Sequence, residues 1–163
     1  MVGAYGKVLR GLCAVLAVVA SLSLLTMIVV TCLDVVLRRV WGRPITGAYD
    51  IVELAGAVTL AGALPYTTAV KGHIAVEYFF HKFGRRGRIA LDTCARLLGF
   101  ALFVCLAWQS VQKGLSLRAA NRTTATLDIP LYWVPWLIAL CSAIVAGVIV
   151  YHLLRPGREL IKP

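Results

Sequence analysis

Three ionisable residues stand at the edges of apolar segments, where a charge is costly and therefore indicates a role. Asp34 and Arg38 are four residues apart, so both lie on one face of a helix. Such a pair can form a local ion pair, or it can bond to another helix or subunit. Glu53 has no basic residue three or four positions away. It can carry protons or ions, or it can contact a loop arginine such as Arg38 or Arg43.

Signatures of catalysis and of cofactor binding are missing from the sequence. It contains no HExxH, no GxSxG and no glycine-rich phosphate loop, so we expect no enzymatic activity. The five cysteines lie in or beside apolar runs without CxxC spacing, which is typical of small buried hydrophobic residues. The three histidines form no pair at matching depth that could bind haem. We therefore expect no metal and no cofactor.

The composition indicates a protein of the lipid bilayer. Hydrophobic residues make up 60% of the 163 residues and charged residues only 15%, whereas a soluble domain has about 25% charged residues. The net charge is +10, and nearly all Lys and Arg residues lie between the apolar runs. This placement indicates contacts with lipid headgroups and a role in topology, and we expect no nucleic-acid partner.

Four apolar stretches are long enough to cross the ~30 Å hydrocarbon core as helices. They are residues 11–37, 47–70, 89–113 and 131–154. The first is longer than the core of a signal peptide, so we expect it to remain as a span. Short loops connect the stretches, and the chain is predicted to be a single integral membrane domain, 1–163.

Small residues mark candidate packing faces on two of these spans. In the second, Ala57 and Ala61 are four residues apart, with Gly56 and Gly62 beside them. In the last, the same spacing joins Ala139, Ala143 and Gly147. Small side chains let helix backbones approach closely in lipid, so both faces are predicted to pack against protein. Thr46 is placed to cap the second span.

A short helix in the membrane surface is predicted between the second and third spans, over residues 74–83. On a helix, one stripe is formed by Val76, Phe79, Phe80 and Phe83. Basic residues follow, among them Arg85 and Arg86. Aromatic rings at the acyl boundary beside cations at the headgroups are typical of an interfacial anchor. The alternative is an ordinary connecting loop.

The distribution of basic residues predicts the orientation. Four spans place both termini on one side of the membrane. Ten Lys and Arg residues lie on that side and six on the other. Because cytoplasmic segments carry more Lys and Arg, both termini are predicted to be cytoplasmic.

The order of three segments resembles a known family. "DVVLRRVWGRPITGAYDIVEL", "YTTAVKGHIAVEYF" and "TLDIP" before a tryptophan-containing last span resemble the small membrane subunit, of DctQ type, of tripartite ATP-independent periplasmic (TRAP) transporters. The likeness covers about residues 10–154. The positions that match the family are Asp34, Arg38, Pro44, Glu53, His73 and Pro130. In particular, Asp34, Arg38, Glu53 and His73 are expected to make structural or subunit contacts.

The resemblance implies a role in import rather than catalysis. Such transporters take up organic acids, including C4-dicarboxylates and sialic acids, using a sodium gradient across the bacterial inner membrane. A periplasmic solute-binding protein captures the solute, and a large membrane subunit carries the transport sites. The small subunit is then expected to scaffold the large one and to bind no substrate itself.

Two other functions are compatible with the residues. The chain could be a self-sufficient, proton-coupled small exporter that uses Glu53. It could also be an anchor subunit of a redox complex, although it lacks paired haem-ligating histidines.

Overall fold

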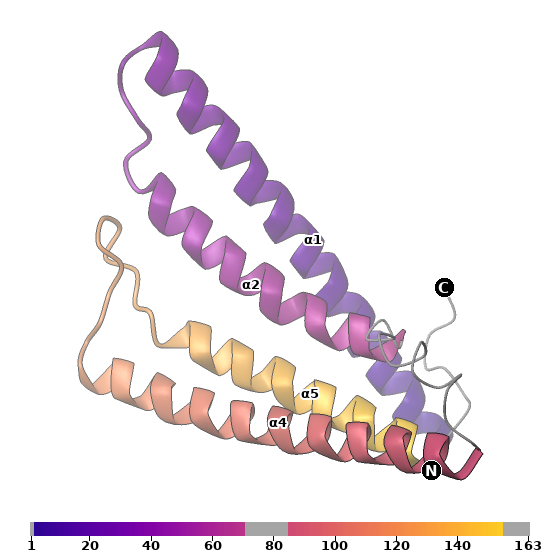
Figure 1. Ribbon diagram of the computed structural model, residues 1–163. Helices are drawn as coiled ribbons and strands as arrows, with labels where there is room; N and C mark the ends of the chain where they lie inside the picture. Colours follow the sequence, from indigo (N-terminus) through magenta and orange to yellow (C-terminus); the bar gives the residue numbers. More distant parts are fainter. Residues whose placement is uncertain (1, 71–84, 155–163) are drawn as a thin grey trace.

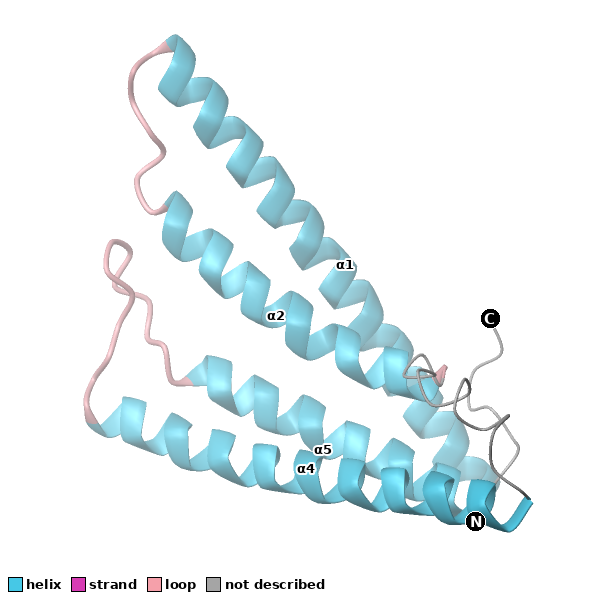
Figure 2. Cartoon of the chain, viewed as in Figure 1, coloured by secondary structure: helices cyan, strands magenta, loops and turns pink. Residues whose placement is uncertain are grey.

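The computed structural model describes residues 2–70 and 85–154 (Figure 1). These residues form four helices, which are α1 (Val2–Val40), α2 (Ala48–Ala69), α4 (Arg85–Ala119) and α5 (Trp133–Leu154). Each is long and apolar enough to cross a membrane. Residues 41–47, between α1 and α2, and residues 120–132, between α4 and α5, form loops and turns, as Figure 2 shows. The predicted all-α fold with four potential spans is therefore confirmed.

The predicted interfacial helix over 74–83 lies outside the described residues. So do His73 and the four residues of the apolar stripe, which are Val76, Phe79, Phe80 and Phe83. Arg85 and Arg86 are the first two residues of α4, and the structure describes their backbone only. The surface helix stays a prediction.

Two helices are longer than the apolar runs that predicted them. Helix α1 spans 39 residues, or about 58 Å at 1.5 Å per residue, so it must tilt or project beyond the hydrocarbon core. Helix α4 extends past the predicted end at residue 113 to Ala119. It stops where Asn121 takes a left-handed conformation, with φ of 46°. The Arg122 N–H then donates to the Leu117 carbonyl, which closes the last turn.

The helices form two hairpins that meet side by side. Helix α1 packs on α2, α2 on α5, and α5 on α4. The hairpins lie close together near the N-terminus and diverge toward the loops at residues 41–47 and 120–132 (Figure 1). We call the first region the apex and the second the loop end. At the apex, a buried cluster from α1, α2 and α5 contains Leu9, Cys13, Ala69, Val148 and Tyr151.

Small residues allow α1 and α2 to approach closely. A side-chain carbon on Gly62 would lie 3.0 Å from the Leu16 carbonyl oxygen and 3.2 Å from the Ala20 Cβ. Nearby, the Ser23 hydroxyl of α1 donates to the Ala55 carbonyl of α2 at 2.9 Å. Of the small residues predicted to pack, Gly62 therefore lies against α1 at this crossing, and Ala61 is buried. In α5, however, Ala143 is exposed, so the predicted small-residue ladder does not form one packed face.

We expect Gly62→Val to destabilise the α1–α2 hairpin by about 1–3 kcal/mol, because the added carbons must displace the α1 backbone. Unfolding in mixed micelles, followed by circular dichroism, measures the effect. Gly56→Ala is the matched control, since an added Cβ would meet only the Met27 sulfur at 3.9 Å. We expect this change to be neutral or stabilising by up to about 1 kcal/mol. Equal losses in both variants would contradict the close approach at Gly62.

Candidate functional site

The loop that joins α1 to α2 is held by Asp34. One carboxylate oxygen accepts a hydrogen bond from Arg38 Nη2 at 2.7 Å. The other oxygen accepts the backbone N–H of Ile45 at 2.8 Å, across the chain reversal. Gly42 takes a left-handed conformation in this reversal, with φ of 67°. Asp34 therefore forms the local ion pair that its spacing predicted, and it also fixes the loop.

The N-cap of helix α2 is Gly47 rather than a residue with a capping hydroxyl. Gly47 has φ of 82°, and no side chain caps this end of the helix, so the predicted role of Thr46 is wrong. The Leu127 side chain lies against the bare Gly47 Cα. A Cβ added to Gly47 would be 2.6 Å from Leu127 Cγ. Glycine is thus required here for its backbone conformation and for the space that it leaves.

Asp50, in the first turn of α2, binds the loop between α4 and α5. Its side chain is buried, with 1% of its surface exposed. One carboxylate oxygen, Oδ2, accepts the backbone N–H groups of Thr126 and Leu127, each at 2.9 Å. A buried carboxylate is stable only with hydrogen-bond donors of this kind. The two bonds therefore connect the loop to the first turn of α2.

The loop between α4 and α5, residues 120–132, is an ordered hairpin that we call the strap. The Thr124 N–H donates to the Ile129 carbonyl at 2.9 Å, and the Leu131 N–H donates to the Arg122 carbonyl at 3.0 Å. The Ile129 N–H donates to the Thr124 hydroxyl. Asp128 has a left-handed φ of 51° at the turn. The strap thereby presents two neighbouring N–H groups to Asp50 across the divergent ends of the hairpins.

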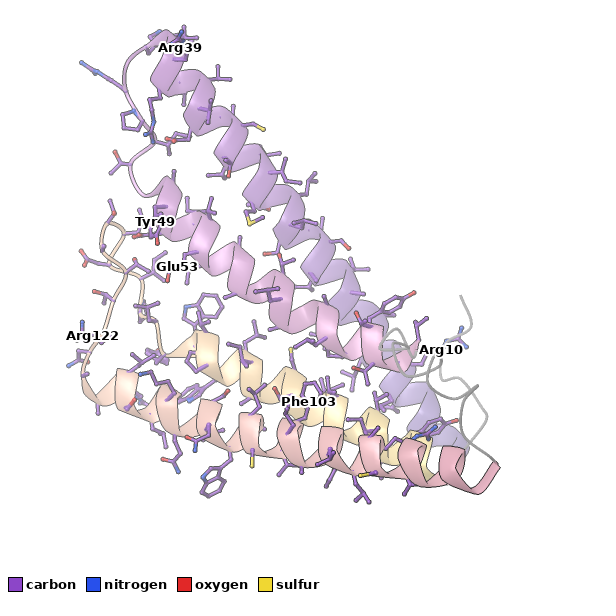
Figure 3. The ribbon with its side chains drawn as sticks, viewed as in Figure 1. Arg10, Arg39, Tyr49, Glu53, Phe103 and Arg122 are labelled. Carbon is purple, nitrogen blue, oxygen red and sulfur yellow. The ribbon has the colours of Figure 1, made fainter. Side chains whose placement is uncertain are left out.

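Glu53 lies one turn after Asp50, but its environment is different. Figure 3 shows Tyr49 and Glu53 on the first turns of α2, at the loop end of the molecule. Both side chains are exposed. Within residues 2–70 and 85–154, Glu53 has no hydrogen bond or ion pair, and the expected contact with Arg38 or Arg43 does not form. Glu53 is therefore available to a group outside the described chain.

A cavity of about 310 Å³ opens beside the Asp34–Arg38 pair, between the facing ends of α1 and α2. Tyr49, Ile45 and Val52 also line it. In the part of the chain that the structure describes, no three His, Cys, Asp or Glu side chains gather as metal ligands. The described polar groups at the loop end are therefore placed for hydrogen bonds and ion pairs rather than for metal binding.

The family model for the DctQ component of tripartite ATP-independent periplasmic transporters matches residues 27–159. The chain belongs to the DctQ family. The matched range contains the two loops, Asp34, Asp50 and Glu53, so the features of the loop end all fall within it. Comparison with curated proteins and with solved structures finds no significant match.

Membership of the DctQ family confirms the predicted resemblance to the small membrane subunit of TRAP transporters. With four helices able to cross a bilayer, the chain is a multi-pass membrane component of a transporter. The role of Asp50 in binding the strap could not be predicted from the sequence around it. An acidic residue in a first helical turn is ordinary, and nothing in the sequence reveals that the strap supplies its partners.

Proposed function

We propose that this DctQ-family chain is the scaffold subunit of a TRAP transporter and packs against a large membrane subunit. The family match over residues 27–159 carries the proposal. It favours a subunit of a larger transporter over a self-sufficient exporter that uses Glu53, and over an anchor subunit of a redox complex.

The exposed surface of the helices supports a partner within the membrane. In the most apolar segment of α1, only 11% of the residues are buried inside the chain, and in that of α4 none are. Large apolar side chains such as Leu22, Leu25 and Leu33 project from α1. In a bilayer these surfaces contact either lipid or another helix.

The polar contacts at the loop end support a structural role for the chain rather than a role in moving solute or ions. Asp34 and Asp50 each hold a loop of this same chain. Glu53 remains exposed at the same end, and we propose that it pairs with a cation of the large subunit. Arg38 and His73 are proposed to support the same interface, Arg38 through Asp34.

The family context extends the proposal to the transport cycle. The complex would import an organic acid, such as a C4-dicarboxylate or a sialic acid, driven by sodium and supplied by a periplasmic solute-binding protein. The subunit would lie in the bacterial inner membrane with both termini in the cytoplasm, as the distribution of Lys and Arg favours. The predicted helix at 74–83 would then anchor it at the cytoplasmic leaflet.

A pull-down of the tagged chain from its native membrane in mild detergent tests the proposal. We expect mass spectrometry to identify a co-purifying membrane protein with many predicted spans. Glu53→Gln should lower the yield of that partner by about tenfold if the carboxylate pairs with a desolvated cation. Recovery of the chain alone would contradict the scaffold role and favour the self-sufficient exporter.

Asp128→Asn is the matched control for the loss of one negative charge. Asp128 is also exposed at the loop end, and asparagine tolerates its left-handed backbone. We expect this variant to retain the partner at the wild-type yield. A similar loss in both variants would show that overall charge, rather than Glu53, matters for assembly.

A further inference from the structure

A second cavity lies at the base of the strap, beside the end of α4. None of the residues proposed to contact the large subunit lines it. We propose that this cavity binds the phosphate group of an anionic phospholipid through Arg118 and Arg122. The acyl chains of the lipid would follow the exposed face of α4 toward the middle of the membrane.

The cavity has a volume of about 200 Å³, and its polar lining groups are mainly hydrogen-bond donors. Its lining residues are Arg118, Asn121, Arg122, Thr123, Pro130 and Tyr132. None of them is acidic, and in the described part of the chain neither guanidinium pairs with a carboxylate. The Thr123 hydroxyl donates to Asp128 Oδ1 at 3.4 Å. Two uncompensated cations beside amide, hydroxyl and phenol groups fit an anion with several oxygens, and arginine binds phosphate through paired N–H groups.

Two aromatic rings lie beside Arg118. Its guanidinium carbon is 6.0 Å from the ring centre of Tyr132 and 6.0 Å from that of Trp136. The two rings meet edge to face, with centres 5.4 Å apart. Gly114 leaves the space that the Trp136 ring occupies, one turn before Arg118. Both rings are thus within cation–π distance of Arg118, which favours a cation at this position.

Backbone hydrogen bonds hold Arg122 at the same cavity. Its N–H donates to the Leu117 carbonyl at 3.1 Å, and its carbonyl accepts the Leu131 N–H at 3.0 Å. The backbone of the site is thus fixed by the end of α4 and by the base of the strap. Less conformational freedom is lost on binding when a site is ordered in advance.

The surface of α4 on the N-terminal side of Arg118 is apolar and exposed. This favours a lipid over a free anion as the ligand. Leu115, Val111 and Trp108 precede Arg118 at spacings of three, four and three residues, so they form one stripe on α4. Their exposed fractions are 48%, 42% and 67%. Tryptophan and tyrosine beside a headgroup site are typical of the membrane interface. An amphiphile can therefore contact the cations and the stripe at once.

The test uses the full chain, purified in a non-ionic detergent, stripped of lipid and titrated with phospholipid. Native mass spectrometry measures the binding of phosphatidylglycerol and of phosphatidylcholine with the same acyl chains. We expect phosphatidylglycerol to bind about tenfold more tightly, and the Arg118→Gln/Arg122→Gln double variant to lose this preference. Excess inorganic phosphate should leave the bound phosphatidylglycerol in place.

Arg39→Gln/Arg43→Gln is the matched control, since it removes two exposed cations at the same end, one from the last turn of α1 and one from the loop at 41–47. It should keep the preference. Equal binding of the two lipids, an equal loss in the control, or displacement by inorganic phosphate would each overturn the proposal. If the double glutamine variant does not fold, Arg118→Lys/Arg122→Lys replaces it. That variant keeps the charge but loses the paired N–H groups, so a weakened preference is expected, and an unchanged one would count against the site.

Discussion

Gly47→Ala is expected to lower the free energy of unfolding by about 2–5 kcal/mol. Two costs combine. A left-handed backbone with φ of 82° costs a residue with a Cβ about 1–2 kcal/mol. The new carbon would also meet Leu127 Cγ at 2.6 Å, and overpacking of this kind costs about 1–3 kcal/mol. Unfolding in mixed micelles measures the sum.

Two controls separate these costs. Gly42 has a similar φ of 67°, but nothing lies within 4 Å of an added Cβ, so Gly42→Ala should show the conformational cost alone. In a Leu127→Ala background, Gly47→Ala should likewise lose its steric part and cost about 1–2 kcal/mol. The same cost with and without Leu127 would show that this side chain does not rest on Gly47.

Asp50→Ala is expected to release the strap from α2. The Thr126 and Leu127 N–H groups would lose their acceptor, and their exchange with deuterium should accelerate by at least about tenfold. Hydrogen exchange of a peptide that covers 123–130, measured by mass spectrometry, reports this directly. We also expect the apparent melting temperature to fall by roughly 5 °C.

Two other variants test the specificity of this effect. Asp50→Asn keeps one side-chain oxygen as an acceptor without the charge, so its exchange rate should be intermediate. Glu53→Gln, one turn further along α2 and exposed, should leave exchange in the strap unchanged. Slow exchange retained in Asp50→Ala would mean that the hairpin bonds of the strap are sufficient to order it.

The sequence was most informative where a property is local and repeated. Runs of apolar residues predicted all four helices, because length and hydrophobicity alone decide whether a helix can cross a bilayer. The spacing of Asp34 and Arg38 predicted their ion pair. The small residues around Gly62 predicted that α2 packs against protein, and Gly62 does lie against α1.

It was least informative where residues far apart in the chain meet. Asp50 and its partners are 76 and 77 positions apart, and no periodic pattern connects them. Thr46 was predicted to cap α2 from residue type alone, but the N-cap is Gly47, against which Leu127 packs. Trp136 lies against Gly114 of α4, another contact that only the folded chain reveals.

The long sequence separation of the strap contact has a consequence for biogenesis. During synthesis, α1 and α2 can enter the bilayer and pair as a hairpin before the later helices exist, since their contacts are close in sequence. Asp50 then has neither of its two N–H partners until α4 has crossed and residues 126 and 127 have emerged on the far side. The bond between Asp50 and the strap thus forms only after α4 has crossed, and it distinguishes such a chain from one in which only α1 and α2 have inserted.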